Sequence, residues 1–300
     1  MDRRKHKVLN NEVVMTVRKS CPACASTSNE KNFVVNGYDI KRCFDCCTMY
    51  VETLPISEAL AAIYTSDSYY VLPTDSMQRI NAENERRLLL IKKIKPSGHF
   101  LDIGCAHGLL LDKAKQVGYE TQGVEPTLAN ATVARGKGHE VFNGWLSDFV
   151  AQNVGQYFDV ITCLDVIEHI DDPKSFLQLA ASLLAEDGLM VISTPNYSGV
   201  IAKLLGAKDP YMTPPEHITF FSIDGMRKLS KACGFQVNSV QSFGSLIPAE
   251  MDRSIQRYIP RPLQFFSPLI RCGVNIAFYL MNTMKVGLEQ ELYLSKSPSK

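Results

Sequence analysis

The sequence predicts an α/β fold with a mainly parallel sheet, preceded by a small module held together by a metal. Short apolar runs alternate with amphipathic segments from residue 84 onward, at the close intervals of a βαβ series. One of these runs, 100–103, breaks into Gly104, Ala106 and Gly108 directly before a helical pattern. Two Cys-x-x-Cys pairs lie near the amino terminus. These three observations define the predicted architecture.

The composition is that of a soluble globular protein, with 45% hydrophobic and 21% charged residues in a chain of 300. The net charge of +1 gives no general electrostatic attraction for a polyanion such as nucleic acid. No apolar run reaches the roughly 18 residues of a membrane span, and the start of the chain lacks the apolar stretch of a signal peptide. We therefore expect a cytoplasmic location.

Four cysteines have the spacing of a zinc site. Cys21 and Cys24 are separated by 18 residues from Cys43 and Cys46, which fits a four-thiolate site formed by two knuckles. Four protein ligands leave no open coordination position, so we expect Zn²⁺ with a structural role. Alternatives are an iron–sulfur cluster, four separate reduced thiols, and Cys47 in place of Cys46 as the fourth ligand.

The module around these cysteines is predicted to be a zinc ribbon over residues 1–54. Asn36-Gly37 lies between the apolar runs 33–35 and 38–40, which is a strong signal for a β-hairpin. A ribbon of this size builds little core, so the metal would supply its folding energy. Residues 1–19 are polar and basic, and we expect a frayed terminus or a single edge strand there, without a functional role.

The rest of the chain divides into strands, helices and two irregular stretches. Helices are predicted at 84–94, 109–117, 127–136, 176–184 (ended by Asp187-Gly188) and 223–232, the last one capped by Ser222. Strands are predicted at 100–103, 120–124, 140–142, 158–164, 189–193, 235–240 and 291–294. Residues 208–221 contain three prolines and are predicted to form an ordered loop.

The turn at 104–108 has the features of a nucleoside site. It lacks the glycine spacing and the lysine of phosphate-binding loops. Asp102 precedes the first glycine, where it would repel a phosphate but could bind hydroxyls. Glu125 follows the next strand about 20 residues later, where an acidic residue binds a ribose diol in nucleotide-binding α/β folds. We therefore expect a nucleoside without phosphates.

Two motifs carry a resemblance to a known family. LDIGCAHG with GVEP, and FDVI followed by LDVIEHIDDP, resemble the class I S-adenosylmethionine-dependent methyltransferases over most of residues 85–245. The resemblance implies a Rossmann-like, seven-stranded, mostly parallel sheet with helices on both faces. It also implies S-adenosyl-L-methionine as cofactor, held by Asp102, Gly104, Ala106, Gly108, Glu125, Leu146, Asp148 and Leu164.

Three of these cofactor residues need comment. The family places glycine where this chain has Ala106, so binding is weakened if this position requires a positive φ or lies against the methionine moiety. The resemblance places Leu146 and Asp148 at the adenine ring, with the acid accepting from its amine. Ser147-Asp148 as a simple helix cap remains an alternative.

A hydroxyl acceptor must lose its proton, and histidine is the commonest general base. His217 follows two prolines in the loop after the fifth strand, and similar small-molecule O-methyltransferases have this motif. It is the first candidate for a catalytic base, and His169 is the second. The alternative for both is a structural role, in which hydrogen bonds to the ring hold the chain.

The predicted methyltransferase domain covers residues 84–300 and follows a linker or lid at 55–83. In the resembled family this segment folds over the cofactor, so Tyr69 and Tyr70 are candidates to line the site, or they pack at the junction. The apolar insertion 248–288 is predicted to be a helical cap on the core. Peripheral contact with a membrane, or a pocket for an apolar acceptor, is the alternative.

The leading hypothesis is a methyltransferase for a small molecule, acting on a hydroxyl oxygen of a sugar, lipid or natural product. Alternatives are a sugar-nucleotide C-methyltransferase, an RNA base methyltransferase, and a cofactor-binding protein without turnover. Only Lys31, Lys41 and Arg42 are basic between Cys21 and Cys46, which argues against nucleic acid as a partner.

Overall fold

A seven-stranded sheet forms the centre of the molecule. The structure is a computed structural model, and it describes residues 15–55, 57–65, 77–243, 280, 283–284 and 287–298. The strands follow one another across the sheet as β12 (Phe235–Phe243), β13 (Glu289–Lys296), β10 (Leu184–Pro195), β9 (Phe158–Leu164), β6 (His99–Ile103), β7 (Glu120–Glu125) and β8 (Glu140–Asn143). Only β13 runs antiparallel to its two neighbours, and the other pairings are parallel. The predicted fold class is confirmed.

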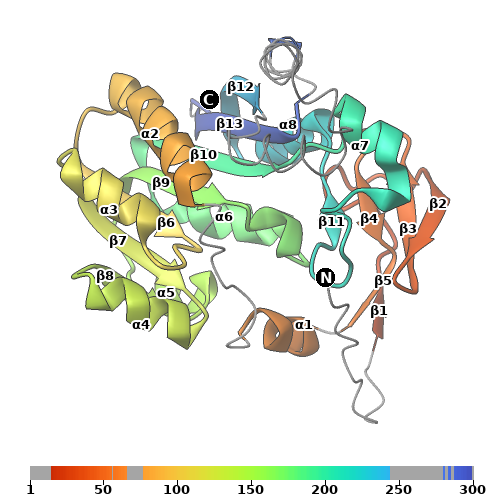
Figure 1. Ribbon diagram of the computed structural model, residues 1–300, viewed down its shortest axis with the longest axis horizontal. Helices are drawn as coiled ribbons and strands as arrows, with labels where there is room; N and C mark the ends of the chain where they lie inside the picture. The colour runs from red at the N-terminus through yellow and green to blue at the C-terminus, as the bar shows by residue number, and fades with distance from the viewer. Residues whose placement is uncertain are drawn as a thin grey trace, which may run out of the picture.

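Three helices cover each face of this sheet (Figure 1). One face packs against α2 (Met77–Ile94), α3 (Leu109–Gln116) and α4 (Leu128–Gly136). The other face packs against α5 (Leu146–Gln152), α6 (Pro173–Leu183) and α8 (Ile223–Ala232). The apolar stripe of each helix lies on the sheet, so two cores form, one per face.

The amino-terminal module contains two small sheets. In one of them, β1 (Met15–Val17) pairs with β5 (Thr53–Pro55). The other has the order β11-β4-β3-β2, formed by β2 (Asn29–Val35), β3 (Tyr38–Cys43), β4 (Met49–Val51) and β11 (Thr219–Phe220). The hairpin predicted at Asn36-Gly37 is confirmed, because β2 and β3 pair antiparallel and both turn residues have positive φ, 50° and 84°.

Strand β11 is far from the ribbon in the sequence, yet it completes the ribbon's sheet. Its residues pair with Tyr50 and Met49 of β4. A third apolar cluster joins the ribbon with α1 (Ser57–Tyr64) and α7 (Val200–Leu205) through Leu54, Leu60, Ala202 and Phe220. Figure 1 shows β11 beside the ribbon strands at one end of the molecule. Buried ribbon residues, among them Cys43 and Tyr50, also belong to the apolar cluster on one face of the larger sheet, so the ribbon and that sheet share a core.

Two expectations from the sequence were wrong in detail. The stretch 208–221 is not all loop, because β11 lies within it and a 3₁₀ turn, Gly206–Lys208, reaches its start. Residues 184–188 form the start of β10 instead of the end of a helix, with a bulge between Leu184 and Leu189. The single edge strand expected as one alternative within residues 1–19 is present as β1, and Arg18 beside it has a role described below. Ser222 does cap α8, since its hydroxyl oxygen accepts from the Gly225 amide at 2.8 Å.

The apolar insertion 248–288 lies almost entirely outside the described residues, so its predicted cap or membrane role stays a prediction. Tyr69 and Tyr70 lie outside them as well. Within the described part of the chain, no helix has both the length and the apolar character that crossing a membrane requires.

Candidate functional site

Two adjoining cavities open where the order of the strands reverses across the sheet. From β6 the order runs to β7 and β8 on one side, and to β9 and β10 on the other. Open α/β sheets bind ligands at the carboxyl ends of strands at such a point. A cavity of about 440 Å³ lies there, and a smaller one of about 120 Å³ adjoins it. Both are lined by Gly104, Ala106, Leu164 and Asp165.

The turn after β6 requires glycine at two positions. Gly104 has φ 78°, and a Cβ there would lie 2.5 Å from Cγ2 of Val166. Gly108 has φ 72° at the start of α3, and a Cβ there would lie 3.0 Å from Cδ2 of His139. Ala106 also has a positive φ, 45°, so its methyl group is held in a strained conformation beside both cavities. The sequence analysis expected weaker cofactor binding if Ala106 had a positive φ, and Ala106 does have one.

Glu125 connects this turn to the next helix. Its Oε2 accepts from the Ala106 amide at 2.9 Å, and its Oε1 accepts from the Thr127 amide at 2.9 Å. The carboxylate is buried at the end of β7 and lines the larger cavity. Each carboxylate oxygen has a second lone pair, so Glu125 can still accept from a ribose hydroxyl.

Asp102 lies in the wall of the smaller cavity. Its Oδ1 accepts from the Thr162 hydroxyl at 2.6 Å, and the side chain is buried. Burial raises the pKa of this carboxyl to about 7, despite the opposing effect of the Thr162 bond. Arg87 lines the same cavity, and its Nε donates to Glu291 Oε2 at 2.7 Å. The smaller cavity thus holds both an acid and a guanidinium, the pair that a zwitterionic amino acid group requires.

The remaining predicted cofactor residues are not all at the cavity. Leu164 ends β9 and lines both cavities, while Leu146 begins α5 and lines the larger one. Asp148 is exposed in the first turn of α5 and lines neither cavity. The N-cap position of α5 is Trp145, so Asp148 is not the capping residue either.

The two predicted catalytic histidines lie together in the wall of the larger cavity. Their rings meet edge to face with centroids 4.7 Å apart. His217 Nδ1 bonds to the Tyr211 carbonyl at 2.6 Å, and His169 Nδ1 bonds to the Glu216 carbonyl at 2.8 Å. A carbonyl can only accept, so the Nδ1 of His217 carries the proton and the basic lone pair of its neutral ring lies on Nε2. The His169 ring also bonds to the Asp165 backbone.

Both rings are kept neutral by their surroundings. Burial and the neighbouring His217 together lower the pKa of His169 to about 3, against the bonds to the Glu216 and Asp165 backbone. Burial also lowers the pKa of His217, against the bond to the Tyr211 carbonyl. At neutral pH the His217 ring is therefore neutral, and its Nε2 lone pair can accept a proton.

The loop that carries His217 is held from three directions. Asn36, in the ribbon hairpin, donates its side-chain amide to the Pro214 carbonyl at 3.1 Å. The Tyr64 hydroxyl of α1 donates to the Glu216 carbonyl at 2.8 Å. Arg18 donates to the Ile218 carbonyl at 3.0 Å. Sequence reasoning missed these three residues, because each acts through a contact between distant segments that no local pattern reveals.

Acidic residues gather on the same side of the cavity. Asp165 follows β9 with a φ of 54°, and its Oδ1 accepts from the Ser193 hydroxyl at 3.0 Å. Burial, reinforced by Asp165, raises the pKa of Glu168 well above its usual value, and burial has the same effect on Glu289. Asp165 and Glu168 stand directly after a predicted strand, so the motif DVIEH was the signal for them in the sequence.

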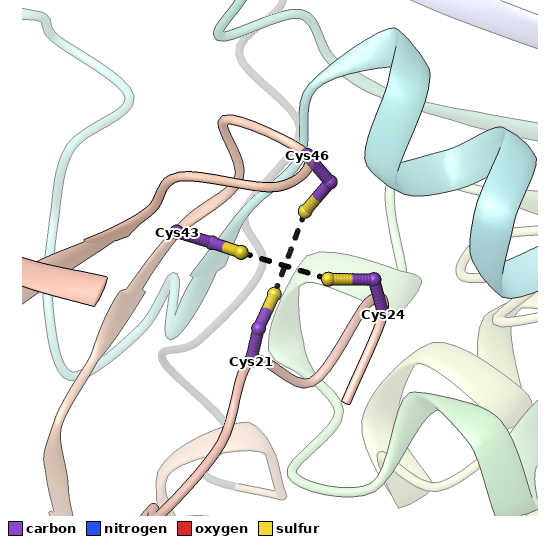
Figure 2. Close-up of side chains that lie close together, drawn as sticks. All are labelled: Cys21, Cys24, Cys43 and Cys46. Atoms are coloured by element: carbon purple, nitrogen blue, oxygen red, sulfur yellow. Dashed lines mark hydrogen bonds between the residues drawn. The ribbon is translucent and has the colours of Figure 1, made fainter. Parts of the chain in front are cut away.

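The four cysteines of the ribbon point at one centre (Figure 2). Cys21 Sγ and Cys46 Sγ are 3.6 Å apart, and Cys24 Sγ and Cys43 Sγ are 3.5 Å apart. Four thiolates around Zn²⁺ at about 2.3 Å would be separated by about 3.8 Å, so the sulfur positions fit this ion. Cys47 is exposed and lies outside the cluster, which places Cys46 as the fourth sulfur.

The second knuckle of this cluster lies on the start of α8. The Ser222 hydroxyl donates to the Cys46 carbonyl, and Lys228 donates to the Asp45 carbonyl. A Cβ on Gly225 would lie 2.0 Å from the Thr48 hydroxyl oxygen, so only glycine allows this approach. The cysteine cluster is therefore anchored to the domain that contains the cavity.

The sheet order, the strained turn after the central strand and the acid after the next strand are those of class I S-adenosylmethionine-dependent methyltransferases. A family model described as a methyltransferase domain matches residues 76–240, more than half of the chain. The chain belongs to this family.

Curated relatives share part of this region. A ubiquinone biosynthesis O-methyltransferase of Actinobacillus pleuropneumoniae serotype 5b (strain L20) is 34% identical over 139 residues, covering 41% of this chain and 58% of the relative. A protein of the same name from Bradyrhizobium sp. (strain ORS 278) is 34% identical over 99 residues, covering 32% and 39%. The match thus spans less than two thirds of these relatives.

Solved structures share the fold. A SAM-dependent methyltransferase from Archaeoglobus fulgidus has a TM-score of 0.53 at 19% identity, covering 73% of this chain and 94% of that one. Magnesium protoporphyrin IX methyltransferase from Synechocystis PCC 6803, with bound SAH, has a TM-score of 0.52 at 14% identity, covering 80% and 99%. At these identities the likeness concerns the fold alone.

Proposed function

We propose that this protein transfers a methyl group from S-adenosyl-L-methionine to a hydroxyl oxygen of a small molecule. Methyl transfer is an in-line displacement, in which the acceptor oxygen attacks the methyl carbon and the sulfur keeps the electron pair of the broken bond. The protein must mainly align the two reactants and exclude water, which supplies up to about 7–11 kcal/mol. The named relatives that are O-methyltransferases support oxygen as the acceptor atom.

The donor is proposed to lie along the turn between the two cavities. Asp102 and Arg87 would bind the amino acid end in the smaller cavity, and Glu125 would bind the ribose in the larger one. Gly104, Ala106 and Gly108 would let the backbone approach the donor, and Leu146 and Leu164 would cover its apolar surface. Asp148 as a partner of the adenine amine stays a prediction.

One observation carries the choice of oxygen: the bond from His217 Nδ1 to the Tyr211 carbonyl. It orients the ring and leaves Nε2 as the basic atom at the cavity wall, where it would accept the proton of a hydroxyl acceptor. His169 packs edge to face against this ring and would keep it in position.

Zinc is proposed as a structural ion of the ribbon, bound by Cys21, Cys24, Cys43 and Cys46. When bound, the ion would crosslink the two knuckles and contribute folding energy. Analysis of the metal content of purified protein tests this, and fewer than about one zinc per chain with alkylatable thiols would contradict it.

The test of the function is a transfer assay with labelled S-adenosylmethionine and a panel of phenols, sugars and sugar nucleotides. Mass spectrometry of the product identifies whether the methyl group is on oxygen or on carbon. A product methylated on carbon, or methylation of RNA only, would overturn the proposal in favour of an alternative enzyme class. Cofactor binding without any methylated product would favour a protein that does not turn over.

A matched pair of variants tests the base. His217→Ala is expected to lower kcat by about 10²–10⁴-fold while the affinity for S-adenosylmethionine stays within about twofold. His99→Ala is the control, because this exposed histidine lies at the amino end of β6, away from the cavity. Unchanged turnover in His217→Ala would end its candidacy.

A further inference from the structure

Tyr64 bonds to segments on both sides of the larger cavity. It is the last residue of α1, which comes directly after the ribbon strand β5 in the chain. Its backbone carbonyl accepts from the Thr127 hydroxyl at 2.8 Å, and its own hydroxyl donates to the Glu216 carbonyl at 2.8 Å. The side chain is 9% exposed and lines the cavity. One residue therefore connects two segments that are far from it in the sequence.

Thr127 links Tyr64 to the acid proposed to bind the ribose of the donor. The Thr127 amide donates to Glu125 Oε1 at 2.9 Å, while its hydroxyl donates to the Tyr64 carbonyl. Thr127 is the N-cap residue of α4, yet its side chain makes no capping bond to the amides of that helix, all of which are described. A threonine at this position ordinarily caps its helix. Here the hydroxyl instead holds the end of α1, where the last carbonyls have no partner within the helix.

The side chain of Tyr64 holds the loop that carries the proposed base. The Glu216 carbonyl, directly before His217, accepts from the Tyr64 hydroxyl and is also bonded to His169 Nδ1 at 2.8 Å. These two bonds use both lone pairs of the carbonyl oxygen. The Tyr64 ring also packs edge to face against the His169 ring, with centroids 5.3 Å apart. Burial raises the pKa of the Tyr64 hydroxyl, so the group stays protonated and able to donate at neutral pH.

Hydrogen bonds thus run without a break from Glu125 through Thr127 and Tyr64 to Glu216. A donor ribose bound to Glu125 would restrict the motion of this carboxylate and of the Thr127 amide bonded to it. Thr127 would in turn restrict the end of α1 and the loop beyond it. A ligand that orders a segment lowers the entropic cost that a second ligand must meet there, which gives positive coupling without a large change of structure.

We propose that Tyr64 is a positioning residue that couples donor binding to the order of the loop carrying His217. A bound S-adenosylmethionine then favours the arrangement of the loop that receives the acceptor, and the donor binds before the acceptor. The inference rests on the proposed function for the places of the donor and the base. Coupling between two sites is reciprocal, so a bound acceptor also strengthens donor binding.

Hydrogen–deuterium exchange of the full chain, with zinc in the ribbon, tests the coupling without any acceptor. Exchange is followed by mass spectrometry with and without a saturating concentration of S-adenosylmethionine. In the unmodified protein the donor is expected to slow the exchange of peptides covering 211–218 by about fivefold or more. In Tyr64→Phe this slowing is expected to disappear, while peptides covering 104–108 are still protected by the donor. The variant keeps the ring and the bond from Thr127 and loses only the hydroxyl.

Tyr119→Phe is the matched control. The Tyr119 hydroxyl also donates to a backbone carbonyl, that of Lys95, but it lies before the amino end of β7, opposite the end that carries Glu125. This variant is expected to retain the donor-dependent slowing at 211–218. A merely structural role of Tyr64 would speed exchange of the loop equally with and without the donor, and that result overturns the proposal.

Thr127→Val breaks the series of bonds at its other end. It removes the hydroxyl but keeps the amide that bonds to Glu125 and a side chain of similar shape. It is expected to lose the slowing at 211–218 as Tyr64→Phe does, and the double variant is expected to lose no more than either single one. Circular dichroism and calorimetric binding of S-adenosylmethionine establish that each variant is folded, and Thr127→Val decides the matter if Tyr64→Phe does not fold.

The outcomes separate this coupling from the function on which it rests. Donor binding that leaves the exchange of 211–218 unchanged in the unmodified protein overturns the coupling and leaves the O-methyltransferase function standing. Slowing that persists in both Tyr64→Phe and Thr127→Val also overturns it. Slowing that is lost in these variants, in a protein that methylates no hydroxyl, supports the coupling and overturns the function.

Discussion

Arg18 donates to the carbonyl of Ile218, 200 residues further along the chain and one residue after His217. The same guanidinium donates to the Thr219 hydroxyl at 3.0 Å and to the Asp171 carbonyl at 2.8 Å. A residue of the amino-terminal module therefore holds both segments that flank the paired histidines, 167–171 and 211–219.

Arg18→Met is expected to lower methyl transfer while the affinity for S-adenosylmethionine stays unchanged. The substitution keeps an apolar stem of similar length but removes the bonds from the guanidinium to the Ile218, Ile170 and Asp171 carbonyls and to the Thr219 hydroxyl. We expect a loss of about 1–3 kcal/mol in the free energy of unfolding and a lower kcat. Chemical denaturation and initial rates measure the two effects. The neighbouring exposed Lys19→Ala is the control, and an equal loss of activity there would contradict the explanation.

Removal of the ribbon's metal is expected to affect the acceptor side before the donor side. The second knuckle supports α8, and the ribbon contacts the loop that carries His217 through Asn36 and Arg18. The turn at 104–108 is held instead by Glu125 at the end of β7, through the Ala106 amide. Cys21→Ser is therefore expected to lower the metal content, the unfolding temperature and the rate of transfer.

Calorimetry at a temperature where Cys21→Ser is still folded should show S-adenosylmethionine binding within about threefold of the unmodified protein. Cys47→Ser, an exposed thiol outside the cluster, should change none of these properties. Loss of S-adenosylmethionine affinity in Cys21→Ser before any loss of transfer rate would contradict this prediction.

Ala106→Gly is expected to tighten cofactor binding. The residue has a φ of 45°, which costs an L-amino acid roughly 1 kcal/mol that glycine avoids. The missing methyl group also gives the donor more room, so affinity should rise about two- to tenfold by isothermal titration calorimetry. Ala25→Gly is a matched control, because Ala25 has a φ of 60° in the ribbon. It should stabilise the fold without a change in cofactor affinity.

Asp102→Asn is expected to stabilise the protein at alkaline pH and to weaken cofactor binding. The pKa of this carboxyl is about 7 in the folded chain and about 3.9 when unfolded, so the folded state binds the extra proton between these values. Stability therefore falls as pH rises from about 4 to 7, and the cost persists above 7.

The amide removes that cost, so Asp102→Asn should gain on the order of 1–4 kcal/mol at pH 8 and almost nothing at pH 4. Denaturant titrations at both pH values measure the difference. Asp187→Asn should show no such gain, since this carboxyl is exposed and paired with Lys95. A gain for Asp102→Asn that did not depend on pH would contradict the assignment.

The sequence predicted the larger sheet well because each of its strands is a short apolar run followed by a break, as at Phe158–Leu164, whose predicted bounds match the structure. Strand β11 was missed because a strand of two residues beside a proline-rich loop is too short to show an alternation of apolar and polar side chains. Only the free edge of β4 makes Thr219–Phe220 a strand, and that edge lies about 170 residues away in the chain.

The side of the cavity proposed for the donor was also visible in the sequence, since Gly104, Gly108 and Glu125 lie at the ends of neighbouring strands. The side proposed for the acceptor was not visible, because it is assembled from α1, the ribbon hairpin and two loops. Tyr64 lines the cavity from the segment predicted as a lid, although Tyr69 and Tyr70 were the residues named there. Asp148 was proposed at the adenine ring from a resemblance alone. In the structure it lies in the first turn of α5 and is exposed to solvent.

The shared sheet of β4 and β11 has a consequence for anyone who wishes to divide or recombine this protein. Cutting the chain between ribbon and methyltransferase core would leave two unpaired strand edges, which are prone to aggregate. It would also expose the apolar contacts that Leu54 and Phe220 make with their neighbours. The ribbon therefore cannot be moved to another protein by itself, and a chimera that contains it must also contain the strand that follows His217.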